Sequence, residues 1–197
     1  MLVYAATANK HKLKEMSEIL NPAGVKVSVH PNYSSLDIAE TGVSFEENAI
    51  IKAMALCKLT DNYVIADDSG LIVDALNGAP GIYSARYAGS QASDEENNLL
   101  LLENMKNVSE YKRSAKFICV IALARGGKII HLFRGECSGR IAHSARGRHG
   151  FGYDPIFIIH DGRSMAELHP VEKNRVSHRN AALVKLAAYI GEEVDSR

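Results

Sequence analysis

The chain has 197 residues, a length that supports one sizeable hydrophobic core. Hydrophobic residues make up 46% and charged residues 23%, which is an ordinary globular balance. Because 23 basic residues match 23 acidic ones, the formal net charge is zero, and this excludes a protein built mainly to coat nucleic acid or an anionic membrane. Any site for an anion must be a local cluster.

The cysteines and the apolar segments indicate a reduced compartment. Cys57, Cys119 and Cys137 stand far apart without a CxxC pair, so we expect neither a zinc site nor a disulfide framework. The N-terminus lacks the features of a signal peptide, and no apolar run approaches the ~20 residues of a membrane helix. We therefore expect a cytoplasmic protein with no membrane partner.

The first third of the chain alternates strand and helix patterns. Residues 1–6 form a β-prone run, and residues 10–20 carry apolar side chains at helical spacing. Residues 25–29 are typical of a second strand. A Ser-x-x-Glu capping box at residues 44–47 predicts a helix from Phe45 to about Leu59.

The middle of the chain begins with a third strand, predicted at residues 63–66 and ending at an Asp-Asp-Ser-Gly turn. Residues 77–83 are rich in Gly and Pro and are typical of a loop. A second capping box at residues 93–96 precedes another helix. Two β-like runs at residues 115–124 and 128–134, separated by Arg-Gly-Gly, predict a hairpin.

The last third starts with a Gly-rich, basic loop at residues 139–154, followed by a strand at 155–159 and a terminal helix at 181–190. No linker or repeat divides the chain. Strand–helix units at the front and a hairpin behind them predict a single α/β domain, residues 1–197, with a mixed sheet and two lobes.

A first candidate site lies where the first strand runs into its helix. The N-terminus of a helix offers unpaired N–H groups and the positive end of the dipole, and Lys12 lies in the first turn. Thr7 and Asn9 add short polar side chains, so this segment is a candidate phosphate cradle, although the chain has no Walker motif. A simple helix cap with a solvated lysine is the alternative.

The adjacent carboxylates of Asp67 and Asp68 form a second candidate site. They interrupt an apolar run, where burying two charges side by side is costly unless a cation accompanies them. Mg²⁺ takes one or two carboxylates and completes its shell with waters and phosphates, and Glu40 offers another carboxylate. A solvated Asp-Ser-Gly turn is the alternative.

The stretch RGRHGFGYDP at residues 146–155 combines cations, aromatic rings and flexible backbone. Phe151 or Tyr153 is suited to stack on a nucleotide base, and the glycines allow a close approach. Downstream, His178 and Arg179 follow Lys173 and form either a cationic wall or the exposed start of the last helix. A mobile surface loop is the alternative for residues 146–155.

Several blocks together resemble the inosine triphosphate pyrophosphatases, which hydrolyse non-canonical purine nucleoside triphosphates. They are TANKHK, ETGVSFEENAIIKA, IADDSGLIVDALNGAPGIYSARYAG, GFGYDPIF and AELHPVEKNRVSHR, in this order and nearly from end to end. The resemblance implies an elongated two-lobed α/β fold around a central mixed sheet with flanking helices, and an active-site groove between the lobes. It also implies a homodimer that acts on a small-molecule nucleotide and not on nucleic acid.

The resemblance also assigns residues. Asp68 is implied to be the general base, and Glu40 and Asp68 the ligands of Mg²⁺. The substrate-binding residues would be Thr7, Ala8, Asn9, Lys10, His11, Lys12, Ser69, Phe151, Gly152, Tyr153, Asp154, Lys173, His178 and Arg179. Position 8 is Ala where many relatives have Gly, which removes no functional group. The role of Asp67 stays open between a supporting partner and a part of the turn.

The implied reaction is attack of water on the α-phosphorus, which yields a nucleoside monophosphate and pyrophosphate. Donors such as Lys173, His178 or Arg179 would bond the 6-oxo group of hypoxanthine or xanthine and disfavour the amino group of adenine. Two other classes compete with this hypothesis: a nucleotide-binding regulatory module without catalysis, and a nucleic-acid-binding protein that uses the basic loop at residues 140–149. The acidic residues count against the first, and the zero net charge counts against the second.

Overall fold

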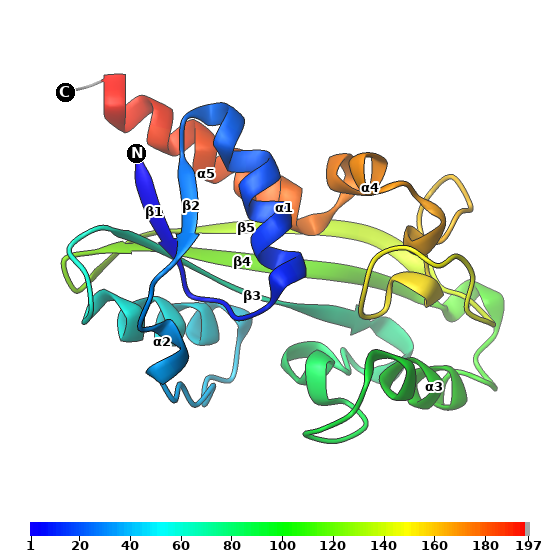
Figure 1. The fold of residues 1–197 in the computed structure, drawn as a ribbon. Coiled ribbons are helices and arrows are strands. Elements are labelled where there is room, and N and C mark those ends of the chain that lie inside the picture. The colour runs from blue at the N-terminus through cyan, green and yellow to red at the C-terminus, as the bar shows by residue number, and fades with distance from the viewer. Residues whose placement is uncertain (196–197) are drawn as a thin grey trace. The chain divides into compact units, whose positions relative to one another are not determined.

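A computed structural model describes residues 1–195 (Figure 1). The mixed α/β fold is confirmed: helices flank a six-stranded sheet with the strand order β2-β1-β3-β4-β5-β6. The strands are β1 (Leu2–Ala5), β2 (Lys26–Val29), β3 (Tyr63–Val73), β4 (Ser114–Arg125), β5 (Lys128–Ile141) and β6 (Phe157–Ile158). The α-helices are α1 (Lys10–Leu20), α2 (Phe45–Cys57), α3 (Asp94–Asn104), α4 (Pro170–Val176) and α5 (His178–Asp195). β1 pairs in parallel with β2 and β3, and β5 pairs antiparallel with β6.

The described chain forms two compact units, each made of segments distant in sequence. The first unit contains residues 1–68, 119–135 and those from 178 onward, and the second contains residues 69–118 and 136–177. β3, β4 and β5 each contribute residues to both units. No helix within residues 1–195 is long and apolar enough to span a membrane.

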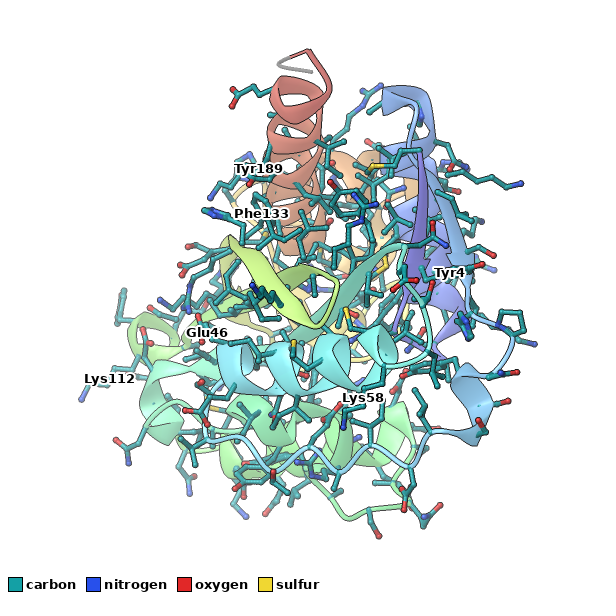
Figure 2. The ribbon with its side chains drawn as sticks, turned by 90° about the vertical axis from the view of Figure 1, so that its left-hand side faces the viewer. Tyr4, Glu46, Lys58, Lys112, Phe133 and Tyr189 are labelled. Atoms are coloured by element: carbon teal, nitrogen blue, oxygen red, sulfur yellow. The ribbon has the colours of Figure 1, made fainter. Side chains whose placement is uncertain are left out.

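In the first unit, helices cover both faces of the strands. Figures 1 and 2 show α1 and α5 on one face and α2 on the other. Residues 119–124 of β4 are therefore buried on both sides, which explains their uninterrupted apolar sequence. Cys119, Ile121 and Leu123 belong to the cluster that also contains the buried apolar residues of α1 and α5. On β5, Phe133 packs against Tyr189 of α5 with ring centroids 5.6 Å apart (Figure 2).

The second unit has its own core and an internal arginine. Leu71, Leu101, Phe117 and Phe157 belong to one buried cluster, in which the two Phe rings lie 4.4 Å apart.

Arg113 of this unit is 1% exposed, and its guanidinium donates hydrogen bonds to main-chain carbonyls. The acceptors are the oxygens of Met105 (2.8 Å), Val108 (3.1 Å), Ile141 (2.8 Å) and Ala142 (2.7 Å). This side chain therefore joins the segment after α3 to the end of β5 by charge-assisted bonds.

Several sequence predictions are confirmed. α1 has the predicted bounds, and Ser93 and Glu96 form the complete capping box of α3. The hairpin of β4 and β5 turns at Gly126 and Gly127, whose φ angles of 57° and 72° match the left-handed geometry that two-residue hairpin loops need. All three cysteines are free thiols.

Other predictions are wrong in extent or in kind. The start of the Gly-rich loop, residues 139–141, belongs to β5 instead. The strand predicted at residues 155–159 contains only β6, because Asp154–Ile156 forms a 3₁₀ turn. The terminal helix begins at His178, and the short helix α4 was not predicted.

We predict that Gly135→Ala is destabilising, because β5 approaches the start of α5 too closely for a side chain. A Cβ at position 135 would lie 2.1 Å from the carbonyl oxygen of His178 and 2.5 Å from the amide nitrogen of Ala182. Both atoms are backbone, so an element must shift, at a cost of ~1–3 kcal/mol or more. Urea denaturation of the variant and the wild type measures the difference in the free energy of unfolding.

The matched control is Gly191→Ala in α5, where a new Cβ meets nothing within 4 Å. This variant should be as stable as the wild type or up to ~1 kcal/mol more stable, since Ala favours helix over Gly. Equal unfolding free energies for the two variants would refute the close approach of β5 and α5.

Candidate active site

The adjacent carboxylates of β3 lie on opposite faces of the strand. The predicted turn at residues 67–70 is wrong, because β3 continues from Tyr63 to Val73. Side chains alternate along a strand, so Asp67 shares a face with Ile65, which belongs to the cluster of α1 and α5. Asp68 points to the other face, toward α2. The two residues are only 2% and 7% exposed, so each needs its own cation.

On the face of α1 and α5, two cations hold Asp67. Lys12 Nζ lies 2.9 Å from Asp67 Oδ2, and Arg179 Nη2 donates to the same oxygen at 3.2 Å. The guanidinium of Arg179 also pairs with Glu15 of α1. Burial alone would raise the pKa of Asp67, but Lys12, Arg179 and Lys52 hold that pKa well below its ordinary value. Asp67 is therefore the ionised centre of a buried network.

On the face of α2, Lys52 joins Asp68 to Glu40. Its Nζ lies 2.8 Å from Asp68 Oδ1 and 2.7 Å from Glu40 Oε1. Burial would lower the pKa of Lys52, but Asp68, Asp67 and Glu40 raise it above the ordinary value, so the ammonium stays charged. Burial raises the pKa of Asp68, and Lys52 opposes this rise.

The helix α2 explains how Lys52 and Glu40 meet. Asn48 and Lys52 are four residues apart and therefore share one face of the helix. Asn48 Nδ2 donates to Asp68 Oδ2 at 3.4 Å, and Asn48 Oδ1 accepts from the N–H of Gly42 at 2.9 Å. The second bond fixes the loop that carries Glu40 close to the start of α2.

The predicted phosphate cradle is a capped helix N-terminus. Asn9 Oδ1 accepts the N–H groups of His11 (2.9 Å) and Lys12 (3.1 Å), and Thr7 Oγ1 accepts the N–H of Asn9 at 3.1 Å. Asn9 therefore caps α1. Lys12 is not a solvated lysine, because its ammonium lies on Asp67. Ala8, Lys10 and His11 are exposed beside it.

The chemistry of the Asp68 face suits a small divalent cation. Two carboxylate oxygens, from Glu40 and Asp68, converge on one point that a cationic nitrogen occupies. Among residues 1–192, whose side chains the structure describes, there is no group of three His, Cys, Asp or Glu side chains that could hold a metal. The donor set therefore fits Mg²⁺, which accepts two carboxylates and takes its other oxygens from water and phosphate. It does not fit a cage made only of protein ligands.

In the second unit, Asp154 organises the predicted base-binding segment. Its Oδ2 accepts the N–H of Phe151 at 2.9 Å and lies 2.6 Å from Lys173 Nζ. The same ammonium is 4.3 Å from the centroid of the Phe151 ring, a cation–π contact. Asp154 is 3% exposed, so it acts as a buried acceptor that joins Phe151 to Lys173.

The neighbouring residues of that segment are fixed by α3 and by a 3₁₀ turn. Asp94 Oδ2 accepts the N–H of Gly152 at 2.6 Å, and Asn98 Nδ2 donates to the Gly152 carbonyl at 3.0 Å. Tyr153 donates its hydroxyl to the carbonyl of Ser84 at 2.8 Å, and burial raises the pKa of this phenol. Residues 151–153 are therefore held by hydrogen bonds to α3, to Asp154 and to the 3₁₀ turn.

The structure brings the predicted residues together as two groups. The first unit holds those on β1, α1, the loop before α2, β3 and α5: Thr7, Ala8, Asn9, Lys10, His11, Lys12, Glu40, Asp68, His178 and Arg179. The second unit holds Ser69, Phe151, Gly152, Tyr153, Asp154 and Lys173. Sequence reasoning missed Lys52, although a lysine between Ala49, Ala53 and Leu56 on the apolar face of a predicted helix signals a buried partner. It also missed Glu15.

We predict that Arg179→Met costs ~3–5 kcal/mol of unfolding free energy, because it leaves Asp67 and Glu15 as buried charges without this guanidinium. Arg134→Met is the control, since Arg134 pairs with Glu46 at the surface and should cost at most ~1 kcal/mol. Chemical denaturation of both variants measures the difference. A loss below ~1 kcal/mol for Arg179→Met would contradict the role of this pair.

The network around Asp67 makes the free energy of unfolding depend on pH. The folded-state pKa of Asp67 lies below its unfolded value of ~3.9, so its stabilising contribution is complete well above that pH. It is lost progressively as the pH falls below that value. In Arg179→Met this acid-side loss, measured by urea unfolding at a series of pH values, should be smaller, because one of the cations that depress the pKa is gone.

Comparisons with known proteins agree over almost the whole chain. A family model described as the Ham1 family matches residues 3–189. The chain is similar to the dITP/XTP pyrophosphatase of Bacillus subtilis (strain 168), with 48% identity over 92% of this chain and 93% of that protein. It is also similar to the dITP/XTP pyrophosphatase of Vibrio vulnificus (strain YJ016), with 47% identity over 97% of each. The solved structure of a HAM1 protein from Coxiella burnetii gives a TM-score of 0.89 at 43% identity and covers 98% of this chain and 99% of that one.

Proposed function

Because this chain belongs to the Ham1 family, we propose that it hydrolyses non-canonical purine nucleoside triphosphates (dITP, XTP and ITP) to the monophosphate and pyrophosphate. The relatives named dITP/XTP pyrophosphatase support this substrate class. The observation that carries the proposal is the convergence of Glu40 and Asp68 on one cationic point in a buried strand and its neighbouring loop. A binding module without catalysis has no need of such a costly buried arrangement.

Glu40 and Asp68 would hold Mg²⁺, which when bound stabilises the charge that develops on the phosphoryl oxygens and the departing pyrophosphate. The start of α1 would bind the triphosphate through Thr7, Asn9 and the ammonium of Lys12. This role of Lys12 requires that it share its three N–H donors between Asp67 and a phosphate oxygen.

Asp68 is proposed as the general base. Its carboxylate takes a proton from a water molecule while the oxygen of that water bonds to the α-phosphorus. The bond between the α-phosphorus and the bridging oxygen breaks, and pyrophosphate leaves with the bond electrons.

Base selection is assigned to the second group of residues and to the start of α5. Phe151 would stack on the purine, with Ser69 and residues 152–154 around it. Lys173, His178 and Arg179 would present donors to the 6-oxo group. A buried donor that meets an amino group instead loses ~1–3 kcal/mol, which corresponds to one or two decades of discrimination against adenine.

The test of the proposed activity is the product. The full-length protein should convert dITP, XTP and ITP with Mg²⁺ into monophosphate and pyrophosphate, and should turn over dATP and dGTP far more slowly. Pyrophosphate is detected by the phosphate released only after inorganic pyrophosphatase is added. Free phosphate without that addition, or equal rates on dGTP and dITP, would disprove the activity.

Asp68→Asn should reduce single-turnover hydrolysis of ITP at saturating Mg²⁺ by ~10²-fold or more, since general-base help contributes ~10²–10⁴-fold. The fold should persist, because Lys52 keeps its ion pair with Glu40 and is not left as an unpaired buried charge. Asp74→Asn is the control: Asp74 is exposed directly after β3, and its loss should leave the rate unchanged. If Asp68→Asn keeps more than about a tenth of the wild-type rate, Asp68 is not the base.

A further inference from the structure

We propose that Lys52 is a built-in counter-cation for Glu40 and Asp68, and that a divalent metal binds these carboxylates only by displacing its ammonium. This inference rests on the proposed function for the position of the metal. It adds that the metal site of the nucleotide-free protein is held in shape, and kept weak, by a competitor within the chain.

The ammonium of Lys52 bridges the two carboxylates directly. Its Nζ bridges Glu40 Oε1 at 2.7 Å and Asp68 Oδ1 at 2.8 Å, which are ordinary lengths for charge-assisted hydrogen bonds. The side chains of Lys52 and Asp68 are 9% and 10% exposed, so water screens their attraction little, whereas the side chain of Glu40 is 31% exposed. The ammonium therefore neutralises two neighbouring carboxylates that would otherwise repel each other.

A metal ion and the ammonium of Lys52 would compete for the same position. Mg²⁺ needs carboxylate oxygens at about 2.0–2.1 Å, so a metal that uses both inner oxygens must approach the point where Nζ lies. Two cations cannot share this point, because like charges at contact distance repel strongly where screening is weak. The ammonium therefore has to swing away from this point when the metal binds.

Lys12 provides a control for Lys52, because it pairs with the other aspartate of β3. It also places an ammonium on an aspartate of β3, at 2.9 Å, but this aspartate is Asp67 on the opposite face. Removing Lys12 changes the net charge of the unit by the same amount as removing Lys52. Only the loss of Lys52 takes away the cation that sits between the proposed metal ligands.

The experiment measures Mn²⁺ binding to the full-length, nucleotide-free protein by electron paramagnetic resonance. Lys52→Met should bind Mn²⁺ about tenfold more tightly than the wild type or better, within the usual range of coupling between two sites. Lys12→Met should stay within about threefold of the wild type, since a charge on the opposite face of the strand contributes less than one at the ligands themselves. The rise in Tm on adding Mn²⁺ should also be larger for Lys52→Met than for the wild type.

A second variant guards against misfolding of the first. Lys52→Gln keeps a hydrogen-bond donor of similar reach without the charge, and it should show the same tighter binding. Adding Glu40→Gln to either variant should abolish the gain. The inference is overturned if neither Lys52 variant binds Mn²⁺ more tightly than the wild type, or if Lys12→Met gains as much. Wild-type hydrolysis of dITP is measured separately, so absence of activity would count against the proposed function and not against the displacement.

Discussion

The alternation of side chains along β3 is the constraint on which the site depends. Consecutive residues of a strand point to opposite faces, so Asp67 and Asp68 do not pair directly with the same cation. Each face must supply its own: Lys12 and Arg179 on one side, Lys52 on the other. The helices that cover the strand are therefore also the source of the charges that make its burial tolerable.

This division gives the two carboxylates different characters. Asp67 has a pKa held low by its cations and is suited to a permanent structural charge. Asp68, whose pKa burial raises, is bound to a single lysine and to Asn48 and is suited to exchange partners. The question that the sequence left open about Asp67 thus has a structural answer, since it anchors the first turn of α1 and the start of α5. Such a scaffold holds the first unit's side chains in place for the chemistry proposed at Asp68.

The sequence predicted those features that depend on neighbouring residues. The helix at residues 10–20, the capping box of Ser93 and the glycine turn of the hairpin follow from local spacing and backbone chemistry, and all are confirmed. The family resemblance rests on blocks that are equally local. Even the apolar run of β4, which is buried on both faces, is visible as an uninterrupted run of residues.

The features that the sequence did not predict depend on residues far apart. Asp-Ser-Gly has the local chemistry of a turn, but β3 continues through it, with cations from positions 12, 52 and 179 on its two carboxylates. Likewise, the contacts of Lys173 with Asp154 and Phe151 could not be read from spacing. The helix α4 was missed because it is short and carries charged residues without a clear apolar face. Long-range pairing of charges, which has no period in the sequence, explains the first two of these cases.

The most direct test of the account is the fate of the water oxygen. Hydrolysis of dITP in water enriched in ¹⁸O, followed by mass spectrometry of both products, shows which phosphorus is attacked. Attack at the α-phosphorus predicts one ¹⁸O atom in the nucleoside monophosphate and none in the pyrophosphate. Label in the pyrophosphate, with an unlabelled monophosphate, would contradict it.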